Sequence, residues 1–97
     1  MLTSKQRAYL RGLAAKEDTI LQIGKDGITE KTAETMSDML RARELVKGRV
    51  LENSMLTARE ACETLSARCR AEQVQVIGSK FVLYKRNEQK PVIELPK

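Results

Sequence analysis

The residues most suited to chemistry lie in one short loop, Gly24-Lys25-Asp26-Gly27, which is followed by Thr29. Two glycines three positions apart let the backbone approach a ligand closely and adopt positive φ angles. Thr29 can cap a helix that starts after the loop, and the unpaired N–H groups at a helix start attract an anion. Together with the ammonium group of Lys25, these features predict a phosphate-binding loop. An ordinary strand-to-helix turn has the same composition, so that alternative stays open.

The sequence does not contain the patterns that support catalysis. It has no histidine, which is the commonest general base and metal ligand at neutral pH. The loop lacks the second half of the Gly-x-x-x-x-Gly-Lys-Ser/Thr motif that cradles a nucleoside triphosphate. No acidic cluster has the spacing of metal ligands. We therefore expect a protein that is not an enzyme and that uses no cofactor, metal or small-molecule substrate.

The two cysteines, Cys62 and Cys69, fall on one predicted helix, seven residues apart. At about 1.5 Å of rise per residue, their Cα atoms are separated by roughly 10 Å, which is too far for a disulfide. We expect buried free thiols in a reducing compartment. No apolar run approaches a membrane span and the N-terminus has no signal-peptide core, so a cytoplasmic protein without membrane association is predicted.

Basic residues outnumber acidic ones by 18 to 13, and the resulting net charge of +5 favours an anionic partner. Candidate contacts outside the loop are Lys5, Arg7 and Arg11 near the start of the chain, and Lys47 and Arg49 on a predicted strand. The first 16 residues contain no acid, which favours an anion-facing surface over an ordinary solvated one. For the strand residues, protection of a sheet edge is the alternative. With two tyrosines, one phenylalanine and no tryptophan, stacking platforms for single-stranded nucleic acid are not expected.

Periodicity and capping residues predict one monomeric domain with the element order αβαβαββ. Capping boxes at Thr3–Gln6 and Thr57–Glu60 begin the first and third helices, and Gly78-Ser79 joins a final hairpin. The predicted elements are a helix beginning near residue 4, a strand at 19–23, a helix at 30–43, a strand at 44–51, a helix at 57–70 and strands at 73–77 and 80–86. We expect a compact α/β domain in which a four-stranded mixed sheet is packed with helices. An extended tail over 87–97 either packs or frays.

Apolar residues at helical spacing define the helix faces that should pack on the sheet. They are Tyr9, Leu10, Leu13 and Ala14 in the first helix, Ala33, Met36, Met39 and Leu40 in the second, and Ala58, Ala61, Cys62, Leu65 and Cys69 in the third. Alternation in the strand at 44–51 directs Val46, Gly48 and Val50 to one side. Lys47 and Arg49 then project from a face that is only partly covered.

With this order of elements, the chain resembles the YhbY family of stand-alone CRM-domain RNA-binding proteins. The resemblance covers about residues 2–86 of a single CRM-type domain over 1–97. It is carried by the stretches Leu2–Ala14, Ile23–Glu30, Leu45–Val50, and Val74–Gly78 with Val82–Tyr84. Each stretch alone is weakly specific, whereas the four in this order are specific.

The resemblance implies a fold similar to the C-terminal domain of bacterial initiation factor three and an RNA-binding Gly-x-x-Gly loop. It also implies a non-catalytic assembly factor that binds ribosomal RNA in precursors of the large ribosomal subunit. Gly24, Lys25 and Gly27 match the family's loop directly, whereas Asp26 departs from the neutral or basic residue more usual there. The complete set of predicted RNA-binding residues is Gly24, Lys25, Asp26, Gly27, Thr29, Lys5, Arg7, Arg11, Lys47 and Arg49. A protein-binding adaptor that makes no direct RNA contact is the remaining alternative.

Overall fold

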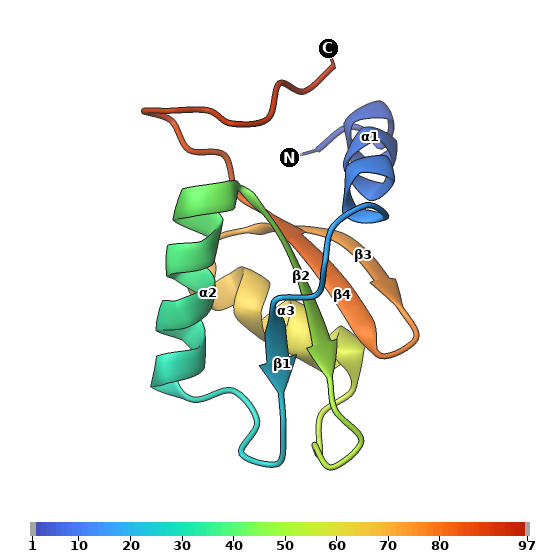
Figure 1. Ribbon diagram of the computed structural model, residues 1–97, viewed down its shortest axis with the longest axis vertical. Helices are drawn as coiled ribbons and strands as arrows, with labels where there is room; N and C mark the ends of the chain where they lie inside the picture. The colour runs from blue at the N-terminus through green and yellow to red at the C-terminus, as the bar shows by residue number, and fades with distance from the viewer. Residues whose placement is uncertain (1, 97) are drawn as a thin grey trace.

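The computed structural model describes residues 2–96, which form three helices and four strands in the predicted order (Figure 1). The elements are α1 (Ser4–Ala14), β1 (Leu21–Ile23), α2 (Glu30–Arg43), β2 (Leu45–Val50), α3 (Ala58–Cys69), β3 (Glu72–Ile77) and β4 (Lys80–Tyr84). The two ends of the predicted domain, Met1 and Lys97, lie outside the described residues. No helix within residues 2–96 is long and apolar enough to cross a membrane.

Each helix begins with a threonine whose side-chain oxygen accepts the backbone N–H of the third helical residue. The side chain of Gln6 in turn accepts the backbone N–H of Thr3, and the side chain of Glu60 accepts that of Thr57. Both predicted capping boxes are therefore confirmed. Thr29 caps α2 as predicted, and there the hydroxyl oxygen of Thr32 accepts the backbone N–H of Thr29 in place of a glutamine or glutamate side chain. Local side-chain chemistry thus sets where all three helices start.

The four strands form one mixed sheet in the order β1-β2-β4-β3. β1 and β2 are parallel because α2 connects them as a crossover, whereas β4 runs antiparallel to both β2 and β3. The predicted hairpin is confirmed, and Gly78 in its turn has a φ of +59°. A bulge between Gln73 and Gln75 shifts the register of β3. Val74 and Val76 consequently reach opposite faces of the sheet, although they are two residues apart.

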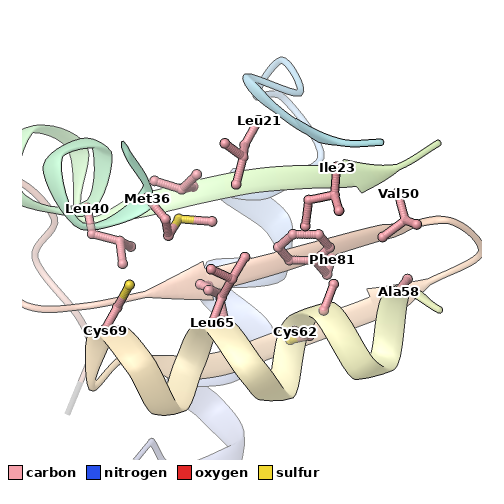
Figure 2. Close-up of a cluster of buried hydrophobic side chains, with 13 residues drawn as sticks. Leu21, Ile23, Met36, Leu40, Val50, Ala58, Cys62, Leu65, Cys69 and Phe81 are labelled. Carbon is pink, nitrogen blue, oxygen red and sulfur yellow. The ribbon is translucent and has the colours of Figure 1, made fainter. Parts of the chain in front are cut away.

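α2 and α3 cover one face of the sheet, and α1 with the C-terminal tail covers part of the other, which gives a layered α/β fold (Figure 1). α2 and α3 enclose the larger core, and Figure 2 shows Leu65 of α3 pointing toward Phe81 and the residues of β1. α1 and the C-terminal tail cover the smaller core, which includes Leu10 and Tyr84. The predicted architecture, a four-stranded mixed sheet packed with helices, is therefore confirmed.

The inner faces predicted for α2 and α3 are confirmed as well. All five α3 positions are buried, and Met39 of α2 is only partly buried. Cys62 and Cys69 are buried free thiols, as expected, and the Sγ of Cys69 donates to the carbonyl of Ala33 at 3.6 Å. Burial raises the pKa of Cys62 to about 11 and also raises the pKa of Cys69. Both thiols are neutral at physiological pH and therefore poor nucleophiles.

Several local details differ from the predictions. β1 begins two residues later than expected because its parallel pairing with β2 reaches only Leu21–Ile23, and β4 ends two residues earlier than expected. Glu44 was expected to start β2, but it ends α2 with a φ of +67° and is fully buried. Tyr9 was expected on the inner face of α1, but it is 43% exposed because the helix buries only Leu10 and Ala14.

The C-terminal tail packs against the domain. The carboxylate of Glu44 accepts backbone N–H groups from Asn87, Val92 and Ile93. The side chains of Ile93 and Leu95 pack against the smaller core. Of the two possibilities left by the sequence, packing is therefore the one observed.

Candidate functional site

The loop between β1 and α2 is a tight turn with an exposed tip. The N–H of Gly27 donates to the carbonyl of Gly24 at 3.1 Å, and Gly27 has a φ of +66°, which residues with a side chain rarely adopt. Lys25 and Asp26 form the exposed tip, and Thr29 caps the helix behind it. The turn uses the N–H of Gly27 internally. The Lys25 ammonium, the backbone of the tip and the start of α2 are the features that can meet an anion.

A second loop, residues 51–57 between β2 and α3, lies against the first. A Cβ atom added at Gly24 would lie 3.7 Å from Asn53 Oδ1, and one added at Gly27 would lie 3.7 Å from Leu56 Cδ1. Both loops follow the carboxyl ends of the parallel strands β1 and β2 and lead into the starts of α2 and α3 (Figure 1). Met55, in the second loop, is 93% exposed. We call residues 24–29 and 51–57 together the loop end.

A row of exposed side chains crosses the sheet beside the loop end. The strand registers pair Arg49 with Gln22 on one side and with Lys80 on the other. Lys80 is paired in turn with Ile77. All four residues are exposed and lie on the α1 side of the sheet, because alternate positions of these strands point into the larger core. This cross-strand row brings two cations together on strands that are about 4.8 Å apart.

The other predicted basic residues belong to the region of α1. Lys47 is half-buried, and its Nζ donates to the last carbonyl of α1 at 3.3 Å, where a cation also complements the helix dipole. Arg7 is half-buried, and its Nη1 donates to a backbone carbonyl of β3. Lys5 and Arg11 are exposed on α1. Two of the four cations are thus held by contacts within the fold.

The ten predicted residues therefore do not form one cluster. The loop and Arg49 share one end of the molecule, whereas α1 lies toward the opposite end, along a longest dimension of 39 Å (Figure 1). The structure thus brings Arg49 to the loop and keeps Lys5, Arg7 and Arg11 away from it.

Exposed residues near the loop that were not predicted as site residues include Gln22, Met55, Ile77 and Lys80. Gln22 and Lys80 carry no signal in the sequence, because the pairing of β4 with β2 is set by tertiary structure. Met55 does carry a signal, since an apolar side chain directly follows the polar turn Glu52-Asn53-Ser54. An apolar residue next to a polar turn can be found in the sequence, and its exposure could then be suspected.

The chemistry available at the loop end is that of an anion-binding surface. It combines the exposed cation Lys25 with backbone N–H groups and two helix starts, and the cross-strand row beside it adds Arg49 and Lys80. Among residues 2–96, no group of three or more His, Cys, Asp or Glu side chains is placed to hold a metal ion. The acidic side chains of Asp26 and Glu52 are exposed beside the cations and reduce the local positive charge.

Proteins similar to this chain occur in several bacteria. It is 38% identical over 96 residues to the probable RNA-binding protein YqeI of Bacillus subtilis, covering 99% of this chain and 100% of that relative. It is 31% identical over 96 residues to a Haemophilus influenzae protein named RNA-binding protein, covering 99% and 96% of the two chains. The solution structure of SAV1595 from Staphylococcus aureus, a hypothetical protein and candidate RNA-binding protein, matches with a TM-score of 0.81 and 49% identity. That match covers 99% of this chain and 100% of SAV1595, and it agrees with the α/β fold described above.

The family model described as the CRS1 / YhbY (CRM) domain matches residues 2–85. This span is almost the one over which the four sequence stretches indicated a resemblance, and it contains every element of the fold. The match covers most of the chain, and it agrees with the relatives found by sequence and by structure. This chain therefore belongs to the CRS1/YhbY (CRM) domain family.

Proposed function

We propose that this chain is a non-catalytic RNA-binding protein that binds ribosomal RNA in precursors of the large ribosomal subunit and assists their assembly in the cytoplasm. Family membership supports RNA binding, since the relatives carry that description in their names. The net charge of +5 supports an anionic partner. The observation that carries the proposal is the register that sets Arg49 beside Lys80 next to the Gly24–Gly27 loop.

In this proposal the loop end contacts the sugar-phosphate backbone. The exposed ammonium of Lys25 supplies a point charge, and the start of α2 presents the positive end of a helix dipole beside it. Arg49 and Lys80 continue the positive surface from the loop onto the open part of the sheet. Contacts of this kind depend little on sequence and weaken as the salt concentration rises.

The α1 region supplies a second set of contacts. Lys5 and Arg11 are exposed on a helix whose 11 residues include no acid, so their charge is not neutralised within the helix. Because α1 and the loop end lie far apart, an RNA that touches both must extend along the domain or fold around it. Ribosomal precursors offer such structured RNA, which proteins meet mostly through shape, phosphates and 2′-hydroxyls.

Crosslinking in cells, followed by sequencing of the bound RNA, tests the proposal. The wild-type chain should enrich RNA of large-subunit precursors. A variant carrying Lys25→Ala, Arg49→Ala and Lys80→Ala should lose most of that signal. The matched control removes three exposed cations that lie away from the loop end, Arg43, Lys85 and Lys90. It loses the same net charge and should keep the signal.

The outcomes separate the parts of the proposal. Enrichment of unrelated RNA would refute the ribosomal target but leave RNA binding intact. Equal losses in both triple variants would show that only net charge matters and would refute the loop end as the contact surface. No crosslinked RNA with a folded wild-type chain would favour the protein-binding adaptor.

A further inference from the structure

A groove of about 460 Å³ opens at the loop end, between the β2–α3 loop and the β3–β4 turn. Leu51, Leu56 and Thr57 line it on the side of the loop, and Gly78-Ser79 line it on the side of the turn. Its volume lies within the range of about 300–1,000 Å³ that is typical of sites for small organic groups. The phosphate contacts proposed above do not use it.

The lining combines an apolar surface with hydrogen-bonding groups. Leu51 and Leu56 are half-buried and supply the apolar part. The hydroxyl oxygens of Ser54 and Thr57 each accept a backbone N–H at 3.1 Å, which leaves both hydroxyl protons available for donation. Glu52 adds a carboxylate, which only accepts. A nucleobase has two apolar faces and an edge with donors and acceptors, so its chemistry matches this lining.

Two residues of the groove lining also lie beside the Gly24–Gly27 loop. Leu51 Cδ1 lies 3.9 Å from the position that a Cβ at Gly24 would occupy, and Leu56 Cδ1 lies 3.7 Å from the corresponding position at Gly27. The same two leucine side chains therefore line the groove and contact the loop. The groove and the loop are thus separated by the side chains of Leu51 and Leu56, so one RNA strand could meet both.

The charges around the groove favour a base over a phosphate as the occupant. Arg49 also lines the groove, and Lys80 is its partner on the neighbouring strand, so both cations are placed to hold flanking phosphates. The carboxylate of Glu52 would repel a phosphate inside the groove. It can instead accept a hydrogen bond from the exocyclic amine of a base.

We propose that this groove takes the base of one unpaired nucleotide while the adjoining phosphates are held by the loop and by Arg49. The protein then prefers RNA that presents an unpaired nucleotide over RNA that is fully paired, because a paired base cannot enter the groove. This inference rests on the proposed function, since it requires that the loop end binds RNA.

The test uses three RNAs: a blunt duplex, the same duplex with one unpaired nucleotide inserted, and that bulged duplex with the inserted nucleotide made abasic. In fluorescence anisotropy, the wild-type chain should bind the bulged RNA about tenfold more tightly than the duplex, a difference of about 1.4 kcal/mol in binding free energy. The abasic RNA should bind only as well as the duplex. This comparison depends on no variant.

A substitution in the protein provides the second arm. Ser79→Trp fills the groove from the turn and keeps the backbone carbonyl of residue 79, which accepts the N–H of Val50 at 2.8 Å. It should abolish the tenfold preference and leave the affinity for the duplex unchanged. The control Thr64→Trp places the same ring on the exposed side of α3 and should keep the preference.

Equal affinity of the wild-type chain for all three RNAs would overturn the base-binding groove and leave RNA binding intact. Abasic RNA that binds as tightly as the bulged RNA would also overturn it, because the deformability of the bulge would then explain the preference. Absence of binding to every RNA would overturn the proposed function together with this inference.

Discussion

The carboxylate of Glu44 accepts the backbone N–H of Ile93 through Oε1 at 2.5 Å, although the two residues are 49 positions apart. The same carboxylate accepts N–H groups from Asn87 at 2.6 Å and from Val92 at 2.7 Å. Glu44 is fully buried, and a buried carboxylate is costly unless it is hydrogen-bonded. The tail therefore satisfies Glu44, and Glu44 holds the tail against the sheet.

Glu44→Ala should lower the free energy of unfolding by about 2–4 kcal/mol, because it removes three charge-assisted hydrogen bonds and leaves partly buried N–H groups unpaired. The tail after residue 86 should also become sensitive to protease. Urea unfolding and limited proteolysis measure both effects. The control Glu94→Ala changes an exposed glutamate of the tail and should stay within about 0.5 kcal/mol of the wild type. Equal stability of the two variants would refute this role of Glu44.

Gly48→Ala should destabilise the domain by about 1–3 kcal/mol or more, because a Cβ at this position would lie 2.4 Å from Cζ of the buried Phe81 ring. Gly12→Ala is the matched control. Position 12 lies in α1 with nothing within 4 Å of an added Cβ, so alanine there should stabilise by up to about 1 kcal/mol. Thermal unfolding of both variants checks the opposite signs. A stable Gly48→Ala protein would show that the Phe81 ring can move aside.

Cys62 should make folding stability fall in alkaline solution. Burial, and secondarily the charge of Glu63, raise its thiol pKa from 9.0 to about 11, against the opposing effect of Arg59. Between these two values the unfolded chain loses the proton and the folded chain keeps it, so stability decreases as pH rises from about 9 to about 11. The loss amounts to about 2–3 kcal/mol for this group.

Urea unfolding of the wild type and of Cys62→Ala, at about pH 8 and about pH 10.5, checks this prediction. The variant should be less stable than the wild type at the lower pH and should lose less stability on going to the higher pH. Its affinity for RNA should be unchanged, since the thiol lies in the core. Identical pH dependence of the two proteins would exclude Cys62 as the cause.

Much of the fold could be predicted because it depends on neighbours in sequence. The caps at Thr3, Thr29 and Thr57 depend on residues at most three positions away, and the buried face of α3 follows from helical spacing. The burial of Glu44 could not be predicted in this way. A glutamate after a helix has an ordinary polar character in the sequence, and its N–H donors come from residues 43 or more positions away.

The same distinction applies to the candidate site. The Gly24–Gly27 turn and its exposed Lys25 follow from local composition, and the structure has them as expected. The neighbouring position of Arg49 and Lys80 depends on the pairing of β2 with β4, which no local pattern specifies. Periodicity also misplaced Tyr9, because it identifies a stripe on a helix and not how much of that stripe the sheet can cover.

RNA binding should weaken steeply with salt, because the candidate contacts are phosphate contacts. If about four phosphates are neutralised, log K should fall against log salt with a slope of about −3 to −4, at about 0.7–0.9 per contact. Lys80→Ala should remove one phosphate contact and so reduce the magnitude of the slope by about 0.7–0.9. The control Lys90→Ala, in the tail, should leave the slope unchanged. A flat salt response of the wild type in a fluorescence assay would exclude phosphate-dominated binding.

The sharpest prediction concerns the tip of the Gly24–Gly27 turn. Lys25 and Asp26 are adjacent, exposed and oppositely charged. Both charges would lie within roughly one Debye length, about 8 Å, of a phosphate bound at the tip, so both should affect its binding. Lys25→Ala should weaken RNA binding and Asp26→Asn should strengthen it, each by about 0.5–1.5 kcal/mol. Gly27→Asp should be more harmful than either, because it adds a negative charge beside the start of α2 and forces a side chain into a φ of +66°.

Binding titrations of these variants, with circular dichroism to confirm folding, distinguish an RNA-binding loop from a simple turn. Gly24→Ala separates backbone approach from charge: a Cβ there meets only ordinary contacts within the protein, at 3.7 and 3.9 Å, and adds no charge, so a loss of affinity would mean that RNA approaches the backbone closely. If the loop binds phosphate, affinity should follow the charge of the tip, with Asp26→Asn above the wild type and Lys25→Ala below it. If all folded variants bind equally, the loop serves only to connect β1 to α2. The RNA surface would then have to be sought among the other exposed cations, which are Arg49, Lys80, Lys5 and Arg11.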